Sequence, residues 1–158
     1  MIRGIHHPSL TTDDLDALLS FYSDLLGFEV ISSFGWETGS DLSELAGNIT
    51  GVTGSTARSA LLKAGNAYLE IFEYTQPLSA RSDTPALSNK GIAHICFDSD
   101  DVKADHARLS ASGVTFKSEP IDVGPMRVCY CQDPDGNFVE LQQITDPQSG
   151  LCLPGYEA

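Results

Sequence analysis

The stretch GIAHICFDSDDV, residues 91–102, repeats a phrase found near the N-terminus, GIHHPSLTTDDL, residues 4–15. Both begin Gly-Ile-x-His, and in both an aspartate followed by an apolar residue comes seven residues after the histidine. Aligning the two stretches pairs His7 with His94. A repeat of this kind predicts a chain built from two similar halves.

A predicted helix follows the repeated phrase in each half, and we expect Asp14 and Asp101 at the two helix starts. The apolar positions of the first helix fall at spacings of three and four, at Leu15, Leu18, Leu19, Tyr22, Leu25 and Leu26. Those of the second helix are Val102, His106 and Leu109. Thr12 or Asp13 can cap the first helix, and Gly27 suits its C-terminal end.

Two further strands are predicted at GFEVI (27–31) and GVTFK (113–117), one in each half. Residues 34–56 are rich in Gly, Ser and Thr and have no counterpart in the second half, so we expect a long loop there. The C-terminal residues carry several prolines and glycines, and their placement does not follow from the pattern.

Each half ends in a predicted hairpin. In the first, ARSALLK (57–63) and AYLEIFE (67–73) flank the turn AGN. In the second, MRVCYCQ (126–132) and FVELQQI (138–144) flank DPDGN, whose Pro, Asp and Gly are strong turn formers. Each half therefore has the predicted order strand, helix, strand, strand, strand.

The last strand of each hairpin carries a glutamate, Glu70 or Glu140, at matching positions. Because side chains alternate along a strand, each glutamate shares a face with aromatic residues, and aliphatic residues occupy the other face. We expect the aliphatic faces to seat the two helices. The faces that carry the glutamates are expected to line a pocket.

Four repeat-related side chains therefore point to one metal site: His7, Glu70, His94 and Glu140. A lone histidine or glutamate on a strand is usually structural, but coincidence explains four matching positions poorly. Two imidazoles and two carboxylates suit a divalent Zn, Ni, Co, Mn or Fe ion, with room for water or substrate. His6 is the rival of His7, but only His7 keeps the seven-residue step to aspartate.

Composition excludes several classes of protein. Nine basic residues against 22 acidic residues give a net charge of −13, so we expect no nucleic-acid partner. No apolar run is long enough for a membrane span, and no secretory signal is visible, so we expect a cytoplasmic protein with no membrane partner. The four cysteines lack metal-finger spacing and are expected to be reduced: Cys96, Cys129, Cys131 and Cys152.

These stretches resemble the vicinal oxygen chelate superfamily, which includes glyoxalase I, methylmalonyl-CoA epimerase, extradiol dioxygenases, and fosfomycin and bleomycin resistance proteins. HHPSLTTDDLDALLSFYSDLLGFEV resembles the family's opening strand and helix. AYLEIFEY, GIAHICFD and DPDGNFVELQQ resemble its three remaining metal-ligand strands. The resemblance spans roughly residues 4–144.

The resemblance implies an α+β fold in which two pseudo-symmetric βαβββ modules form an open β-barrel centred on a divalent metal, commonly in a homodimer. The modules would cover about 4–75 and 91–145 of one domain, 1–146, followed by a tail, 147–158. By position, the ligands carry over to His7, Glu70, His94 and Glu140. The ligands of one ion could come from one chain or from both chains of a dimer.

The activity implied is that of a metal-dependent lyase or isomerase of glyoxalase I or epimerase type, which transfers a proton alpha to a carbonyl through a metal-stabilised enolate. We expect Glu140 to stay on the metal and Glu70 to loosen and move the proton. Epimerases of the family carry a second catalytic glutamate near the position of Gly54 here. Glu37 or Glu44 could replace that base, or both could simply be solvated.

Two other functions stay open. The first is an Fe(II)-dependent extradiol-type dioxygenase, which also needs acid–base groups beside the metal. His6 and His106 are predicted to face away from the pocket or to lie on a helix, which disfavours that alternative. The second is a non-catalytic small-molecule binding or resistance protein, which the intact ligand set disfavours.

Five side chains are predicted to contact a small-molecule substrate: Arg58, Tyr68, Phe72, Arg127 and Phe138. The two arginines could clamp an anionic group or serve as structural cations. Trp36 and Tyr130 could line the same apolar pocket, or belong to the core or the surface.

Overall fold

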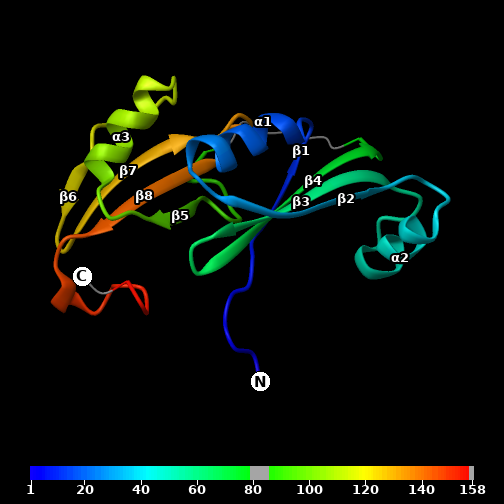
Figure 1. The fold of residues 1–158 in the computed structure, drawn as a ribbon, viewed down its shortest axis with the longest axis horizontal. Helices are drawn as coiled ribbons and strands as arrows, with labels where there is room; N and C mark the ends of the chain where they lie inside the picture. The colour runs from blue at the N-terminus through cyan, green and yellow to red at the C-terminus, as the bar shows by residue number, and fades with distance from the viewer. Residues whose placement is uncertain (79–85, 157–158) are drawn as a thin grey trace. The chain divides into compact units, whose positions relative to one another are not determined.

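A computed structural model describes residues 1–78 and 86–156 of the chain. The chain divides into two compact units, Met1–Ser82 and Asp83–Ala158 (Figure 1). Each unit contains one helix-covered four-stranded sheet, so the boundary falls between the two predicted modules. We call the two units the first and the second module.

The first module contains four strands, β1 (Ser9–Thr12), β2 (Glu29–Trp36), β3 (Thr56–Ala64) and β4 (Ala67–Gln76). Its helices are α1 (Leu15–Leu19), which continues as a π-helical segment over Ser20–Leu25, and α2 (Asp41–Thr50). The sheet order is β1-β4-β3-β2, with β1 parallel to β4 and the other pairs antiparallel.

The second module contains β5 (Ile95–Asp98), β6 (Ile121–Val123), β7 (Met126–Gln132) and β8 (Phe138–Ile144). Its helix is α3 (Val102–Ala111), and a short 3-10 helix covers Pro147–Ser149 in the tail. The sheet order is β5-β8-β7-β6, with β5 parallel to β8 and the other pairs antiparallel.

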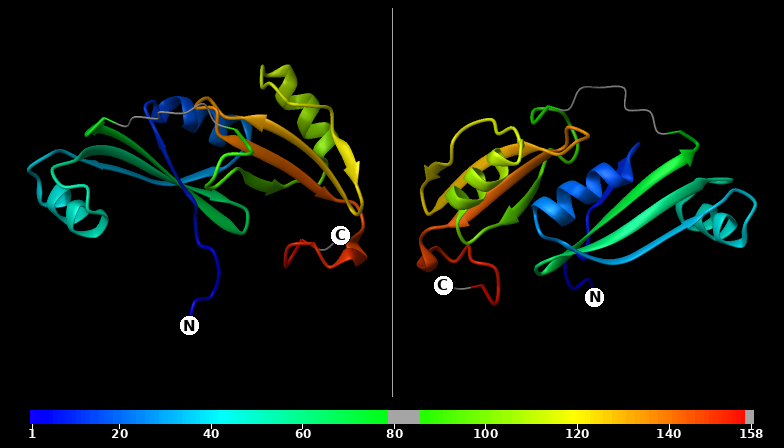
Figure 2. Two further views of the ribbon diagram at one scale, coloured as in Figure 1. Left: turned by 180° about the vertical axis from the view of Figure 1, so that it is seen from behind. Right: turned by 45° about the horizontal axis from the view of Figure 1, so that its top comes forward.

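The two sheets therefore have the same topology, in which the first strand of each module lies beside the last one. This confirms the predicted α+β fold of two βαβββ modules. Figure 2 shows each sheet with its helix on one face, α1 against β4 and α3 against β7 and β8. The expected barrel concerns the two sheets together and stays a prediction.

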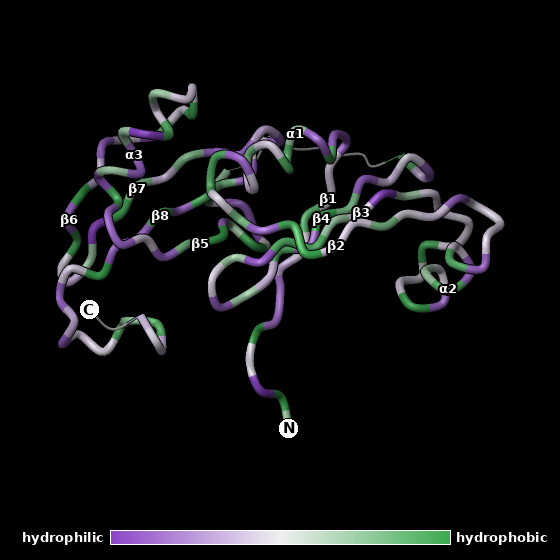
Figure 3. The backbone as a smooth tube through the Cα atoms, in the orientation of Figure 1, coloured by the Kyte–Doolittle hydropathy of each residue, from purple (hydrophilic) through white to green (hydrophobic). Residues whose placement is uncertain are grey.

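The core of each module lies between its helix and the aliphatic face of its hairpin, as predicted. In the first module, Leu69 and Ile71 are fully buried beneath α1. In the second, Val139 and Leu141 are buried beneath α3, together with the cysteines of β7. Each of these strands carries both apolar and polar residues, as the colours of Figure 3 show.

Both predicted helix starts are confirmed. The carboxylate of Asp14 accepts a hydrogen bond from the Ala17 N–H at 3.0 Å, and that of Asp101 accepts one from the Ala104 N–H at 3.0 Å. The predicted cap at Thr12 or Asp13 is wrong, because the hydroxyl of Thr12 instead accepts the N–H of Asp14 at 2.9 Å. Gly27 has a φ of 79°, which supports its predicted role at the helix end.

Two other predictions need correction. Residues 34–56 are not one long loop, because β2 extends to Trp36 and α2 follows, with Ser40 as its N-cap. The strand predicted at GVTFK (113–117) is reduced to a single bridge between Phe116 and Cys131, and β6 takes the place beside β7. Pro120, just before β6, lacks the N–H that a longer ladder would need.

Within residues 1–78 and 86–156, no helix has the length and apolar character needed to cross a bilayer.

Candidate metal centre

The first predicted pair of ligands meets in the first module. The Nε2 atom of His7 lies 3.5 Å from the Oε2 atom of Glu70. His7 sits just before β1, and Glu70 sits in the middle of β4 opposite Ser9. Backbone hydrogen bonds from the β4 amides of Tyr68 and Glu70 to the carbonyls of His6 and Pro8 hold the approaching chain against the strand.

The second predicted pair meets in the second module. The Nε2 atom of His94 lies 3.0 Å from the Oε2 atom of Glu140. The hydroxyl of Tyr130 donates a hydrogen bond to the same carboxylate oxygen at 2.6 Å, and the Tyr130 ring meets the His94 ring edge to face at 5.4 Å. Burial, and then the hydrogen bond to Glu140, raises the pKa of Tyr130, which keeps the phenol protonated as a donor.

Strand register makes the two pairs equivalent. Ser9 pairs with Glu70 and Cys96 pairs with Glu140, and each histidine lies two residues before the residue that faces its glutamate. Within each module, the parallel contact between first and last strand therefore brings one imidazole to one carboxylate. The repeat in the sequence thus corresponds to a repeated side-chain geometry.

The spacing inside each pair fits two neighbouring ligands of one divalent ion. Bonds of about 2.1 Å place adjacent donor atoms roughly 3.0 Å apart at a right angle and roughly 3.4 Å apart at a tetrahedral angle. The distances of 3.0 and 3.5 Å match these values. Neutral imidazole and carboxylate donors suit Zn, Ni, Co, Mn or Fe.

Neither pair is joined by a third ligand of its own module. Over residues 1–78 and 86–156, no three His, Cys, Asp or Glu side chains converge in a way that could hold a metal ion. Each module thus brings one histidine and one glutamate together. The complete set of four ligands stays a prediction.

The position of His6 differs from the expectation. Its ring stacks on Tyr68, with centroids 4.8 Å apart, and its Nδ1 atom lies 2.7 Å from Nδ1 of His7. Tyr68 and Glu70 share one face of β4, so His6 does not face away from the glutamate. Strand alternation fails here because β1 begins only at Ser9. His106 lies on α3, as predicted.

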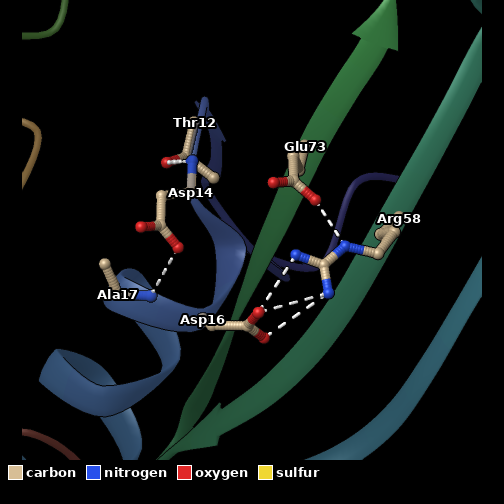
Figure 4. A network of polar contacts seen from close by, with 6 residues as sticks. All are labelled: Thr12, Asp14, Asp16, Ala17, Arg58 and Glu73. Carbon is tan, nitrogen blue, oxygen red and sulfur yellow. Dashed lines mark hydrogen bonds and ion pairs between the residues drawn. The ribbon is translucent and has the colours of Figure 1, made fainter.

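Both arginines lie on the faces opposite the glutamates. Arg58 pairs in register with Glu73 and forms ion pairs with Glu73 and Asp16 of α1 (Figure 4). Arg127 pairs in register with Gln143, and its Nε donates to Asp122 at 2.7 Å. The structure thus gives each arginine acidic partners on the helix-facing side of its sheet.

The predicted aromatic contacts lie on the same faces as the glutamates. Tyr68 and Phe72 flank Glu70 along β4, and Phe138 precedes Glu140 on β8 by two residues. The Phe138 ring is covered by the ammonium group of Lys117 at 5.2 Å. Glu37 lies just before α2 and Glu44 lies within its first turn, and both are exposed.

The sequence interpretation left the role of Tyr130 open between pocket lining, core and surface. The sequence contained the signal for this contact. A five-residue turn pairs Gln132 with Phe138, and that register places Tyr130 opposite Glu140. The corresponding residue opposite Glu70 is Leu61, which has no hydroxyl.

The chain matches a protein-family model. The model of the Glyoxalase/Bleomycin resistance protein/Dioxygenase superfamily covers residues 4–141. A glyoxalase family protein from Bacillus cereus has a solved structure with a TM-score of 0.77 at 21% identity, covering 90% of this chain and 94% of that one. At that identity the likeness is one of fold.

Curated relatives are similar over most of the chain. A lactoylglutathione lyase of Schizosaccharomyces pombe is 26% identical over 157 residues and 93% of this chain, and the chain spans 50% of that relative's length. A lactoylglutathione lyase of Pseudomonas aeruginosa is 28% identical, covering 89% of this chain and 82% of the relative. A 2-epi-5-epi-valiolone epimerase of an Actinomyces species is 31% identical, covering 87% and 78%.

Proposed function

Because the chain belongs to the Glyoxalase/Bleomycin resistance protein/Dioxygenase superfamily, we propose that it is a divalent-metal-dependent lyase or isomerase. The reaction proposed is transfer of a proton on a carbon alpha to a carbonyl. The observation that carries the proposal is the pair of equivalent His–Glu contacts, each with the donor spacing of neighbouring ligands. The lyases and the epimerase among its relatives support the same class of chemistry.

The proposed ligands of a single ion are His7, Glu70, His94 and Glu140. A divalent cation held by them supplies Lewis acidity, which makes a C–H bond beside a carbonyl more acidic. The contact between His6 and His7 supports ligation through Nε2 of His7, because the second ring nitrogen of a ligating histidine usually has a hydrogen-bond partner.

The two glutamates have different proposed roles. Tyr130 holds Glu140, whose side chain is 12% exposed, whereas the Glu70 side chain is 22% exposed and faces Leu61. We therefore assign Glu140 as the fixed carboxylate and Glu70 as the base. Glu70 accepts the proton from the alpha carbon, and in a lyase or isomerase it returns the proton to the neighbouring carbon. Inversion in an epimerase would need a second group that delivers a proton to the opposite face of the alpha carbon.

The substrate is proposed to be a small molecule that contacts Tyr68, Phe72 and Phe138, which share the faces of the glutamates. The arginines are proposed to act as structural cations, because their acidic partners lie on the opposite faces. A cytoplasmic homodimer, the common assembly of the family, is the proposed form.

One observation supports a second candidate function, that of a dioxygenase. In an Fe(II)-dependent extradiol-type dioxygenase, a histidine beside the metal ligands can act as acid or base. The contact between His6 and His7 at 2.7 Å provides such a group. The surplus carboxylate, Glu70, still favours proton transfer, because an iron triad needs only two histidines and one carboxylate.

The deciding experiment compares Glu70→Gln with Glu140→Gln. Each protein is purified without chelators, its metal is quantified by mass spectrometry, and hydrogen–deuterium exchange alpha to the carbonyl is followed in a panel of α-hydroxy ketones and thioesters. We expect Glu70→Gln to keep its metal and lose exchange by at least about 10³-fold, and Glu140→Gln to lose most of its metal. Exchange that survives in Glu70→Gln contradicts the assignment.

Oxygen uptake with Fe(II) and a catechol would favour the dioxygenase instead. A wild-type protein that holds no metal, and gains no activity on reconstitution, would favour a binding protein.

A further inference from the structure

Four aromatic rings cluster on the Glu70 face of the first sheet. We call this cluster the aromatic surface, and it consists of Phe34, Trp36, Phe72 and Tyr74. Trp36 lies 6.0 Å from Phe34, 6.1 Å from Phe72 and 6.2 Å from Tyr74 between ring centroids. Phe72 and Tyr74 are 5.7 Å apart. The rings therefore form one continuous group.

The aromatic surface lies on the face of the sheet opposite α1. Helix α1 packs against the face of β4 that carries the buried Leu69 and Ile71. On the other side, Phe34 on the edge strand is 49% exposed, whereas Trp36 is 9% exposed and its Nε1 donates to the Ser55 hydroxyl at 2.9 Å. Phe72 follows Glu70 by two residues, so the surface begins about 7 Å along the strand from the proposed base. Burial and the charge of Glu70 raise the pKa of Tyr74, which agrees with this closeness.

A hydroxyl without a partner lies inside this aromatic surface. Ser59 is paired in register with Phe34 on one side and Phe72 on the other, and it is 1% exposed. Its Oγ atom has no hydrogen-bond partner. Buried polar groups are normally paired, so an unpaired one calls for an explanation, and a bound ligand atom is one that would satisfy it. Phe34, one of the two rings paired with Ser59 in register, is 49% exposed.

The second module lacks this feature at the same register. Val128 and Gln142 occupy the positions of Ser59 and Phe72, and Met126 and Ile144 occupy those of Ala57 and Tyr74. The βαβββ fold therefore does not require aromatic residues there.

We propose that the aromatic surface binds an aromatic or flat apolar part of the substrate, and that Ser59 hydrogen-bonds to a polar atom on that part. The proposal rests on the proposed function and names its substrate class, a compound with two neighbouring oxygens at one end and a ring at the other. An apolar protein surface would leave the Ser59 hydroxyl unpaired, whereas a ring that carries one polar atom satisfies it.

The test uses hydroxamates, whose two neighbouring oxygens chelate a metal. Acetohydroxamate, 3-phenylpropanohydroxamate and its 4-hydroxyphenyl analogue are titrated into the Zn-loaded full chain, by calorimetry and by the emission of Trp36, the single tryptophan. We expect the phenyl compound to bind about 10- to 50-fold more tightly than acetohydroxamate and to change Trp36 emission. The 4-hydroxyl should add about 5-fold, and Ser59→Ala should remove only that increment.

Ser33→Ala is the matched control, because Ser33 pairs with Ala60 on the opposite face of the same sheet and should leave all three affinities unchanged. If acetohydroxamate binds and the phenyl compound binds no more tightly, this inference is wrong but the proposed function still stands. If no hydroxamate binds and His7→Ala changes nothing, the proposed function itself fails.

Discussion

The two modules share a topology and a His–Glu pair, yet they differ in almost everything that touches the pair. The Glu140 carboxylate is held by the hydroxyl of Tyr130 at 2.6 Å, while Leu61 faces Glu70 at the same register. In the first module, aromatic rings continue along the strand beyond the glutamate, and Gln142 stands at the position of Phe72 in the second. Under the proposed function, this difference assigns the second module to holding a metal ligand and the first to receiving the substrate.

The opposite faces differ as well. Three residues beyond each glutamate, the first module pairs Arg58 with Glu73, and the second pairs Arg127 with the neutral Gln143. Asp16, two residues after the helix cap, completes the network in the first module (Figure 4).

Lys103 occupies the position of Asp16 in the second module, so its helix supplies no carboxylate to the arginine there. Arg127 instead donates a hydrogen bond to Asp122 on β6. An ion-pair network therefore ties helix to sheet in the first module, and the second has no equivalent among these positions.

The largest effect is expected from Arg58→Ala. The side chain of Glu73 is only 12% exposed, and removal of the guanidinium leaves its carboxylate without its cation. We expect the free energy of unfolding to fall by about 2 kcal/mol, measured by urea denaturation with circular dichroism and Trp36 emission.

Arg127→Ala provides the matched control in the other module. Asp122 is 68% exposed, so the loss should stay below about 1 kcal/mol. The double variant that combines Arg58→Ala with Glu73→Gln should recover part of the lost stability, because it no longer has an unpaired carboxylate at position 73. Equal losses of unfolding free energy in the two arginine variants would contradict the stronger ion-pair network of the first module.

A smaller effect is expected from Tyr130→Phe, which keeps the ring and removes only the donor to Glu140. We expect metal affinity to weaken about 10-fold, because partners that orient a ligand contribute about this much. Metal competition with a chromophoric chelator measures the change.

The reverse exchange, Leu61→Tyr, places a hydroxyl opposite Glu70. It should slow proton transfer with unchanged metal content, because a held carboxylate moves less readily. Unchanged metal affinity in Tyr130→Phe would show that the hydrogen bond from Tyr130 to Glu140 does not contribute to metal binding.

How far the sequence predicts the structure depends on how local the signal is. The hairpin around DPDGN has its predicted bounds, because Pro, Asp and Gly specify the turn and alternation specifies the faces. The pairs around Glu70 and Glu140 follow from the repeat. Helix α2 was missed because its Gly- and Ser-rich composition concealed a capped helix, which begins after Ser40 and ends at the left-handed Gly51.

Contacts that depend on pairing between distant strands were harder to predict. The aromatic surface joins β2, β3 and β4, and the position of Ser59 between two rings depends on the register of both neighbouring strands. An irregularity between Val30 and Ser32 shifts that register, so counting along the sequence alone does not give it. His6 was misplaced for a related reason, since it precedes the first paired strand residue.

The smallest expected effect is a difference in hydrogen-exchange protection between the two helix starts. Asp14→Ala and Asp101→Ala each remove one cap hydrogen bond and should cost about 1 kcal/mol. Leu15 and Leu18 anchor the first turn of α1, whereas the buried residues of α3, Val102 and Leu109, lie seven positions apart.

The first turn of α3 should therefore open more readily once its cap is lost. Native-state hydrogen exchange should show a larger loss of protection at the amides after Asp101 than at those after Asp14. Equal losses would mean that packing anchors the two helices equally well, and the contrast between the modules would then be confined to the surroundings of the two glutamates and the arginines.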